Sequence, residues 1–535
     1  MKIKNLKLKI ILFILIITGI ILRFYNLNWG FPFYFHPDER NIASAISQLN
    51  FPNQMNPNFF AYGSFPMYTA YFIGVAINGI IMVDSITSVS LQNSILFLRF
   101  ISFILSVFSL FVIYKVGKEI SGKEVGVLSF LLASLSTGFI QFSHFGTFET
   151  ILSFLSLILF FMCLKLIGKI NICFVLISGL IFGLLLGTKI SSITLFPVIF
   201  FSLIYGVKNS NIFSIKNTML YLLFFLINAA FAFFVTNPFS FFDYSSFIQA
   251  LKYESSVAWG NFHVFYTGEF MNSIPVLFQL QYVYPFLLNP VLEIIFLISF
   301  IFLLIKSAKD KNVKIVLLLL FFLFQFIPQA FLFAKWTRYM VSTLPFIYII
   351  VAYFIYHFLS KQFRINLSIA LVLISFLFSL SFAKTAYFNK DTRISAYEWM
   401  KTRVKSNNLI LSEAYDLGIL PFNQFFSQIS LFNFYDLDTI PMAQSKTTLD
   451  VALEKNNYIV LPSPRVFRNR LANPTNFPAG HKFYKDLISD KLGYRKIYET
   501  PCDILCKIAY LGDPVFNIEE TITVFDRPTV YIFKK

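Results

Sequence analysis

The chain has 535 residues, of which 57% are hydrophobic and 13% charged, and its mean hydropathy is +0.68. This composition is too apolar for a soluble enzyme. The formal net charge of +17 does not indicate nucleic-acid binding, because the basic residues form small clusters between apolar runs rather than one patch. Repeated apolar stretches of roughly 17–23 residues match the length needed to cross a hydrocarbon core of ~30 Å. The sequence therefore predicts a polytopic α-helical membrane protein.

Eleven apolar runs are predicted to span the membrane. The first is expected to stay uncleaved, because Thr18-Gly19-Ile20-Ile21 offers no pattern of small residues for a signal peptidase. The predicted spans cover approximately residues 9–23, 94–114, 124–141, 150–166, 171–187, 190–207, 217–235, 286–305, 315–333, 339–358 and 366–383.

A twelfth apolar run, residues 62–83, is assigned to the membrane interface by the distribution of basic residues. If this run does not span, seventeen Lys and Arg residues lie in cytoplasmic segments and six in outer loops. If it does span, every later loop changes sides, and the excess of basic residues after the first helix falls outside instead of in the cytoplasm. Eleven spans place the N-terminus in the cytoplasm and the C-terminus outside the cell membrane.

Two outer segments, about residues 237–285 and the C-terminal region, are long enough to fold outside the membrane. The first outer loop covers about residues 24–93 and contains the interfacial run, and the second large outer loop covers about 237–285. From about residue 385 the composition becomes that of a soluble domain. We expect residues 1–384 to form the transmembrane domain and residues 385–535 a small extracytoplasmic α/β domain. Its short β-like and helical runs fall at 409–411, 458–461, 529–533, 395–405 and 482–491.

The C-terminal region also holds two of the four cysteines. Cys502 and Cys506 can pair if this region is extracytoplasmic, where disulfides persist. A zinc site is less favoured, because no second Cys or His pair accompanies them at ligand spacing. The sequence leaves the state of these two thiols open.

The most informative motif is His36-Pro37-Asp38-Glu39-Arg40, about 15 residues after the first apolar run. An ionisable side chain in a membrane protein is a candidate functional residue. The predicted topology brings further polar residues to the same outer face, from the turns between later spans. The candidates for catalysis are Asp38, Glu39 and Glu149, and those for donor-phosphate or substrate binding are Lys189, Arg338, Lys335, His144, His36 and Tyr62.

This set of residue types suits one kind of substrate. Carboxylates beside basic groups at a membrane surface fit a phosphate at headgroup level with a reacting centre next to it. Arg binds phosphate bidentately and Lys supplies a point charge. A carboxylate within reach of an acceptor hydroxyl can act as a general base, which contributes roughly 10²–10⁴-fold. Structural alternatives remain open: Asp38 and Glu39 can stabilise a helix N-terminus, Glu149 can be a solvated turn residue, and Lys189 can simply snorkel.

In these motifs the chain resembles the C-type glycosyltransferases, polytopic enzymes that use polyprenyl-phosphate sugars. It is most similar to the protein O-mannosyltransferase and aminoarabinose-transferase branch, over roughly residues 1–385. The motif Gly63-Ser64-Phe65-Pro66 in the interfacial run departs from this branch, because it lacks a Pro-Pro pair with a nearby Lys. The motifs that carry the resemblance are Asp38-Glu39, Gly63-Ser64-Phe65-Pro66, Leu98-Arg99-Phe100, the basic turn 114–126, the segment from His144 to Glu149, Gly187-Thr188-Lys189, and Arg338-Tyr339 before Pro345.

The resemblance implies an inverting sugar transfer at the outer membrane face. Asp38 would deprotonate the acceptor, Glu149 would be the second acidic residue, and Lys189 and Arg338 would hold the donor phosphate. The implied partners are membrane lipid, a polyprenyl-phosphate-linked sugar, and a protein, lipid or glycan acceptor, with no nucleic acid. No ligand cluster demands a metal ion, and the sequence leaves a divalent cation at the two acids open. The C-terminal domain would select the acceptor.

Two other functions are kept open by the sequence alone. A transporter or flippase of lipid-linked saccharides requires charged residues near the midplane of the spans, where the sequence has almost none apart from Arg99 near one end. A non-catalytic membrane assembly subunit would bind a partner through its outer domain. Transfer of a labelled sugar by the purified protein distinguishes an enzyme from both.

Overall fold

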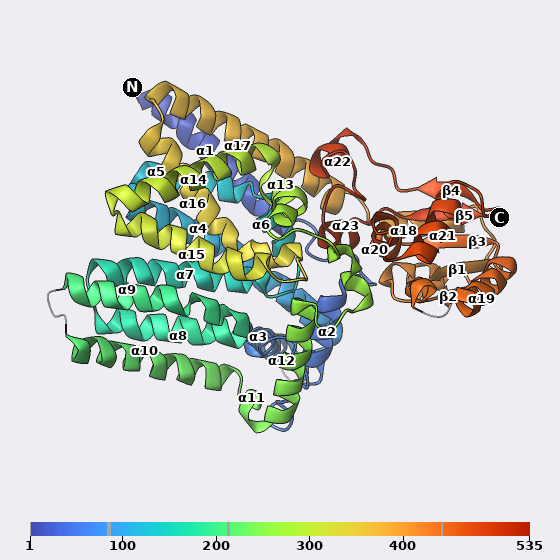
Figure 1. The fold of residues 1–535 in the computed structure, drawn as a ribbon, viewed down its shortest axis with the longest axis horizontal. Coiled ribbons are helices and arrows are strands. Elements are labelled where there is room, and N and C mark those ends of the chain that lie inside the picture. Colours follow the sequence, from blue (N-terminus) through green and yellow to red (C-terminus); the bar gives the residue numbers. More distant parts are fainter. Residues whose placement is uncertain (1, 83–86, 211–213, 440–441) are drawn as a thin grey trace.

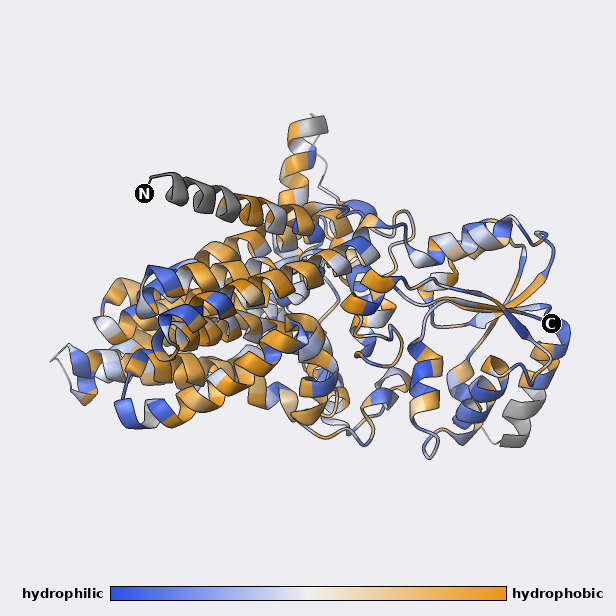
Figure 2. Cartoon of the chain, turned by 90° about the horizontal axis from the view of Figure 1, so that it is seen from above, coloured by the Kyte–Doolittle hydropathy of each residue, from blue (hydrophilic) through white to orange (hydrophobic). Residues whose placement is uncertain are grey.

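A bundle of helices makes up most of the molecule, with a small sheet-containing region at one end of it (Figure 1). The computed structural model describes residues 2–82, 87–210, 214–439 and 442–535. Figure 2 shows that hydrophobic residues predominate in the helices of the bundle, whereas hydrophobic and hydrophilic residues are mixed in the C-terminal region. The helices of the bundle are α1 (Lys2–Phe24), α4 (Leu91–Ser121), α5 (Lys123–Ser134), α6 (Thr137–Ser143), α7 (Glu149–Gly168), α8 (Ile172–Thr188), α9 (Phe196–Asn209), α10 (Ile215–Thr236), α14 (Pro290–Asp310), α15 (Val313–Ala330), α16 (Leu344–Phe358) and α17 (Lys361–Ala383).

Shorter helices connect the bundle helices and gather at the end that faces the sheet (Figure 1). They are α2 (Pro37–Ser47), α3 (Phe65–Met82), α11 (Phe239–Phe242), α12 (Tyr244–Trp259) and α13 (Tyr284–Leu288), with the 3₁₀ helices η1 (Ile190–Leu195), η2 (Phe265–Phe270) and η4 (Thr337–Thr343) and the π-helices η3 (Gln279–Val283) and η5 (Lys384–Phe388).

Eight helices in the described part of the chain are long and apolar enough to cross a membrane, and a ninth candidate is the pair α5–α6, which is bent by 59°. The predicted first and fifth spans coincide with shorter apolar helices, residues 13–24 and 172–188. Every predicted span thus falls on an apolar helix, and the number of membrane crossings stays a prediction.

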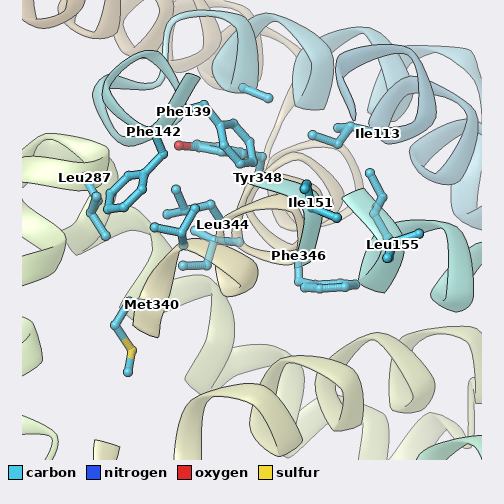
Figure 3. Packing of buried hydrophobic residues seen from close by; sticks show 14 of the residues in the cluster. Ile113, Phe139, Phe142, Ile151, Leu155, Leu287, Met340, Leu344, Phe346 and Tyr348 are labelled. Carbon is cyan, nitrogen blue, oxygen red and sulfur yellow. The ribbon is translucent and has the colours of Figure 1, made fainter. Parts of the chain in front are cut away.

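The centre of the bundle is filled by aromatic and branched side chains. In Figure 3, Phe139 and Phe142 of α6 lie beside Leu344 and Tyr348 of α16, with Ile151 of α7 close by. The span that contains α16 is 78% buried, whereas the span that contains α10 is 17% buried. Therefore α16 is the core helix, and α10 presents most of its apolar surface outward, as a lipid-facing helix does.

The C-terminal region contains one five-stranded sheet with the strand order β2-β1-β3-β5-β4. Strand β1 pairs in parallel with β2 and β3, and β5 runs antiparallel to β3 and β4. Its elements are α18 (Thr392–Lys401), β1 (Leu409–Glu413), η6 (Leu417–Ile419), η7 (Phe422–Gln424), β2 (Gln428–Phe432), η8 (Phe434–Asp438), α19 (Met442–Lys455), β3 (Tyr458–Leu461), α20 (Arg465–Ala472), α21 (Pro478–Ile488), β4 (Arg495–Glu499), α22 (Ile504–Ala509), α23 (Glu520–Val524) and β5 (Tyr531–Lys534).

The three strands predicted from the sequence correspond to β1, β3 and β5, so the expected mixture of strands and helices is confirmed. The two edge strands, β2 and β4, were not predicted, because much of each is exposed and neither shows a buried apolar pattern. Cys502, just before α22, forms a disulfide with Cys506, which lies inside α22.

Candidate active site

Four of the predicted site residues meet at the end of the bundle that faces the C-terminal region. Asp38 comes from α2, Glu149 from the first position of α7, Lys189 from the junction of α8 and η1, and Arg338 from η4. Their charges act on one another, and Glu149, Lys189 and Arg338 line the same cavity. Residues spread over 300 positions of the sequence therefore form one cluster.

Asp38 and Arg338 form the ion pair at the centre of this cluster. Pro37 opens α2, so Asp38 lies in the first turn of the helix, where unpaired backbone N–H groups favour a carboxylate. Burial opposes ionisation of Asp38, but the charges of Arg338, His36 and Arg465 outweigh it and hold the pKa of Asp38 below its usual value. The Asp38 carboxylate is ionised and remains partly exposed.

Glu39 has different surroundings from its neighbour. Its carboxylate is fully buried and pairs with Arg99 of α4, at 3.0 Å from Oε1 to Nε and 2.6 Å from Oε2 to Nη2. The backbone N–H of Gly146 also donates to Glu39 Oε1, at 2.6 Å. The same guanidinium donates to the carbonyl oxygens of Leu27 and Trp29. Glu39 thus joins α2, α4 and the segment before α7, and it lies away from the four-residue cluster.

A close approach of two backbones positions Lys189. Gly63 N donates to Thr188 O at 3.0 Å, and a Cβ on Gly63 would lie 1.9 Å from the carbonyl oxygen of Gly187. Only glycine allows this contact, which fixes the end of α8 against the first loop. The Lys189 ammonium lies 4.2 Å from the ring centroid of Tyr339. Burial lowers the pKa of Lys189 to about 8, against the opposing charge of Glu149.

Two cavities open beside Lys189, Arg338 and Tyr339. The first, which we call the polar cavity, is lined by Glu149 and by hydroxyl and amide side chains of α7, η1, α15 and η4. One carboxylate oxygen of Glu149 and both amide atoms of Gln325 are buried there without a hydrogen-bond partner in the structure. The second, which we call the apolar groove, has a volume of about 240 Å³. Its walls include Phe60, Tyr62, Leu186, Phe233, Leu251 and Trp259.

The remaining predicted residues lie around the cluster in different roles. Tyr62 lines the apolar groove and packs against Phe148, with ring centroids 3.9 Å apart. The His36 ring lies between Phe145 and Phe525, and burial lowers its pKa. Lys335 lines neither cavity, and its ammonium donates to the carbonyl oxygen of Phe333 at 3.1 Å.

His144 is also outside the cluster. Its two ring nitrogens lie 2.8 and 2.9 Å from the carbonyl oxygens of Ile140 and Tyr25, and its ring stacks on Tyr387 at 3.7 Å. These contacts hold α6, the end of α1 and η5 together. The structure therefore surrounds His144 with backbone and aromatic groups rather than with the charged residues of the cluster.

Two residues that the sequence did not single out face the cluster. Glu254 of α12 lines the apolar groove near Lys189 and Arg338, and burial raises its pKa, opposed by the charge of Arg338. Arg465 of α20 belongs to the C-terminal region, and its charge acts on Asp38. Neither residue lies in a recognisable motif; the only available signal for Glu254 was its position in the second large loop.

The described side chains of this cluster do not form a three-ligand metal site. Within residues 2–82, 87–210, 214–439 and 442–535, no group of three or more His, Cys, Asp or Glu side chains lies close enough to hold a metal ion. Asp38 is engaged by Arg338, and Glu39 by Arg99. The donor set therefore does not fit a three-ligand site.

Part of the chain matches a known protein family. The sequence model of a family described as dolichyl-phosphate-mannose-protein mannosyltransferase matches residues 82–236. No curated protein matches the sequence significantly.

Solved structures share the fold. The archaeal oligosaccharyltransferase AglB from Archaeoglobus fulgidus, in complex with an inhibitory peptide and a dolichol-phosphate, is 12% identical with a TM-score of 0.54, over 98% of this chain and 88% of that one. The same enzyme in complex with Zn and sulfate gives 13% identity and a TM-score of 0.50, over the same shares of both chains. ArnT from Cupriavidus metallidurans, bound to undecaprenyl phosphate, is 11% identical with a TM-score of 0.45, over 88% of this chain and 94% of that one.

The resemblance to the C-type glycosyltransferases predicted from the sequence is therefore confirmed. The apolar helices and this fold identify an integral membrane protein, and the family match together with the fold indicates a glycosyltransferase.

Proposed function

We propose that this membrane glycosyltransferase moves a sugar from a polyprenyl-phosphate-linked donor to an extracytoplasmic acceptor, with inversion at the sugar carbon. One observation carries the proposal: Asp38, Glu149, Lys189 and Arg338 converge from four separate elements, and Lys189 and Arg338 also line the apolar groove. A base, a second acid and two cations beside an apolar groove provide the groups that such a donor needs.

The donor is proposed to bind with its lipid chain in the apolar groove and its phosphate at Lys189 and Arg338. Most of the groove is lined by apolar and aromatic side chains, and both cations line it as well, together with Glu254. Burying an isoprenoid chain against the apolar walls of the groove is favourable, and the phosphate then remains beside the two cations. Structures with the same fold have been solved with dolichol-phosphate, which supports this class of ligand.

The reaction breaks the bond between the sugar carbon and the phosphate oxygen and forms a bond from that carbon to the acceptor oxygen. The electron pair of the broken bond goes to the polyprenyl phosphate, and Lys189 and Arg338 stabilise this developing negative charge. The proton of the acceptor hydroxyl goes to the carboxylate of Asp38. No step in this scheme needs a metal ion.

Donor binding is proposed to activate the base. In the free protein the Arg338 guanidinium is held by Asp38, and this pairing lowers the basicity of the carboxylate. A donor phosphate beside Arg338 competes for the same guanidinium. The competition weakens the pairing with Asp38 and raises its pKa toward the value that a general base requires.

The other predicted residues are assigned supporting roles. Glu149 has a carboxylate oxygen without a protein partner, which leaves it able to accept a hydrogen bond from a sugar hydroxyl. Glu39 holds α2 in place through Arg99 rather than reacting. Tyr62 and His36 shape the surroundings of the groove and of Asp38.

The same proposal fixes the orientation of the chain. The site and residues 385–535 are placed on the extracytoplasmic side, with residues 1–384 as the membrane domain and the N-terminus in the cytoplasm. The disulfide between Cys502 and Cys506 supports this side, because disulfides persist in oxidising compartments. The acceptor is a protein, lipid or glycan that carries a free hydroxyl group.

The test is transfer of a labelled sugar from a synthetic polyprenyl-phosphate donor by the purified protein. Asp38→Asn keeps the shape of the side chain and removes the base, so we expect turnover to fall by roughly 10²–10⁴-fold. Asp450→Asn, on the exposed face of α19, is the matched control and leaves turnover unchanged. Near-normal turnover in Asp38→Asn refutes the assigned base, and the absence of any transfer by the wild-type protein favours a transporter or an assembly subunit.

A further inference from the structure

The last long segment before β5 is buried throughout and lies against the site. Residues 518–530, which include α23, are all buried. In Figure 1, α23 lies between the bundle and the sheet, close to α20. Within this segment, residues 519–527 form what we call the C-terminal strap. The strap contacts residues adjacent in sequence to both members of the central ion pair.

The first contact is made by Glu519 beside Arg338. Glu519 is fully buried, and its Oε2 accepts a hydrogen bond of 2.9 Å from the backbone N–H of Thr337, the first residue of η4. Its Oε1 accepts from the N–H and the hydroxyl of Thr521, both at 3.0 Å, at the start of α23. One carboxylate therefore caps two helices at once, and one of them carries Arg338 as its second residue.

The second contact is made by Phe525 beside Asp38. The Phe525 ring lies 4.1 Å from the ring of His36, the residue that precedes the first turn of α2. A third contact adds charge, because Glu520 pairs with Arg465 at 3.0 Å and the charge of Arg465 acts on Asp38. Asp38 and Arg338 belong to different elements, so a segment that touches the neighbours of both restricts their relative position.

We propose that Glu519 is a positioning residue for Arg338, and that the C-terminal region completes the active site through the strap instead of serving only to select the acceptor. This inference rests on the proposed function, because it assigns Glu519 an effect on donor-phosphate binding. The N–H of Thr337 precedes Arg338 by one residue, so losing its acceptor releases the start of η4. Arg338 then loses its fixed orientation toward Asp38 and toward the donor phosphate.

The chain offers two ways to remove the same hydrogen bond. Glu519→Ala removes the acceptor. Thr337→Pro removes the donor and keeps the carboxylate, and the local backbone accepts it: Thr337 opens η4, and Trp336 has φ −58° and ψ 142°, as the residue before a proline requires. The Thr337 hydroxyl has no partner to lose. If Glu519→Ala does not fold, Thr337→Pro carries the test.

The control is Glu413→Ala in β1. Glu413 is buried like Glu519, and its two oxygens accept the backbone N–H groups of Tyr415 and Phe434, at 3.2 and 3.3 Å. It belongs to the sheet and lies away from η4. This variant measures the general effect on binding of losing a buried carboxylate that accepts two hydrogen bonds in the C-terminal region.

The measurement is the affinity of the purified full chain for a synthetic polyprenyl phosphate without sugar, by calorimetry in detergent. We expect Glu519→Ala and Thr337→Pro each to weaken binding by about tenfold. Glu413→Ala should change it by less than about twofold. In an Arg338→Ala background, Glu519→Ala should add less than about twofold, because a positioning residue acts only through the group it positions.

Each other outcome refutes either the inference about Glu519 alone or the proposed donor site as well. If Arg338→Ala weakens binding but Glu519→Ala and Thr337→Pro bind like the wild type, the inference fails and the proposed donor site stands. The same holds if the effects of Glu519→Ala and Arg338→Ala are additive, or if Glu413→Ala is as damaging as Glu519→Ala. If Arg338→Ala binds polyprenyl phosphate like the wild type, both the donor site and the inference are refuted.

Discussion

Mutations of the two neighbouring carboxylates of α2 should have different effects, one on stability and the other on turnover. Glu39→Gln is the informative change, because it removes the charge of a fully buried carboxylate and keeps its size. We expect this variant to lose stability, whereas Asp38→Asn should lose turnover and keep stability. The prediction follows from the different partners of the two side chains.

The size of the effect can be worked from the contacts of Glu39. Its oxygens accept two hydrogen bonds from Arg99 and one from Gly146 N, and neither charged side chain is exposed to water. Breaking a buried ion pair by removing one partner typically costs about 3–5 kcal/mol, since the other charge stays buried without compensation. Gln keeps one oxygen as an acceptor, so we expect the lower end, about 3 kcal/mol. In a chain of this size that corresponds to a fall in Tm of roughly 3 °C.

The assay combines thermal unfolding of the purified protein in detergent with sugar transfer at a temperature where the variant is folded. Glu39→Gln should unfold earlier and retain most of its turnover per folded molecule. Asp38→Asn, one residue away on the same helix, is the internal control for the substitution itself. A Glu39→Gln protein with wild-type Tm and no turnover refutes the structural role of Glu39 and returns it to the reaction.

Three further predictions follow from the residues around the groove. Because the pKa of Lys189 is lowered to about 8 by burial, its charge is present below pH 8 and lost above it. We therefore expect kcat/KM for the donor to fall above about pH 8 in the wild type but not in Lys189→Arg; an unchanged profile would assign the fall to another group. Gly63→Ala should cost roughly 1–3 kcal/mol of stability and weaken donor binding, because its Cβ would lie 1.9 Å from Gly187 O; normal melting and binding would show that the loop can shift. Glu254→Gln removes a negative charge beside the phosphate site and should tighten binding of polyprenyl phosphate by roughly threefold to tenfold, read by calorimetry; weaker binding would mean that Glu254 contacts the ligand.

Hydrophobic length predicted where the bundle helices lie, because an apolar run of this length is stable across a bilayer only as a helix. It did not predict the bend between α5 and α6. The break falls at Ser134-Leu135-Ser136-Thr137-Gly138, a short stretch of small and polar residues that lies inside the predicted span 124–141. The break depends on Arg23 of α1, whose guanidinium donates to the carbonyl oxygens of Ala133 and Ser134, and on Ser136, which caps α6. The two Arg23 contacts join positions more than 100 residues apart, so no local pattern reveals them, whereas the Ser136 cap is local.

The acidic pair shows the same limit at the site. Asp38 and Glu39 were both predicted as candidates for catalysis, because adjacent carboxylates in a motif look equivalent in the sequence. On a helix, consecutive side chains point about 100° apart, so one reaches the cluster and the other enters the core. The direction is set by Arg99, whose position relative to α2 depends on how α4 packs. The motif located the site, and only the fold separates the two side chains.

The residues that the sequence missed are those supplied by the C-terminal region and by α12. Glu254, Arg465 and Glu519 stand in segments of ordinary polar composition, without a motif or periodicity. Their proximity to the cluster is produced by packing between parts of the chain that are far apart in sequence. Residues of this kind become visible only when the three-dimensional neighbours are known.

Arg338 has three relations whose combination accounts for the arrangement of the site. It pairs with Asp38, it lines the groove in which the donor is proposed to bind, and the backbone N–H at the start of its helix donates to Glu519. A guanidinium free to follow either anion would stay with Asp38 when the phosphate arrives, and the base would remain weak. If the start of η4 is held by Glu519, the guanidinium of Arg338 cannot move toward either anion. It then has to share its N–H donors between Asp38 and the phosphate. Rigid placement of Arg338 is therefore the condition under which donor binding raises the basicity of Asp38.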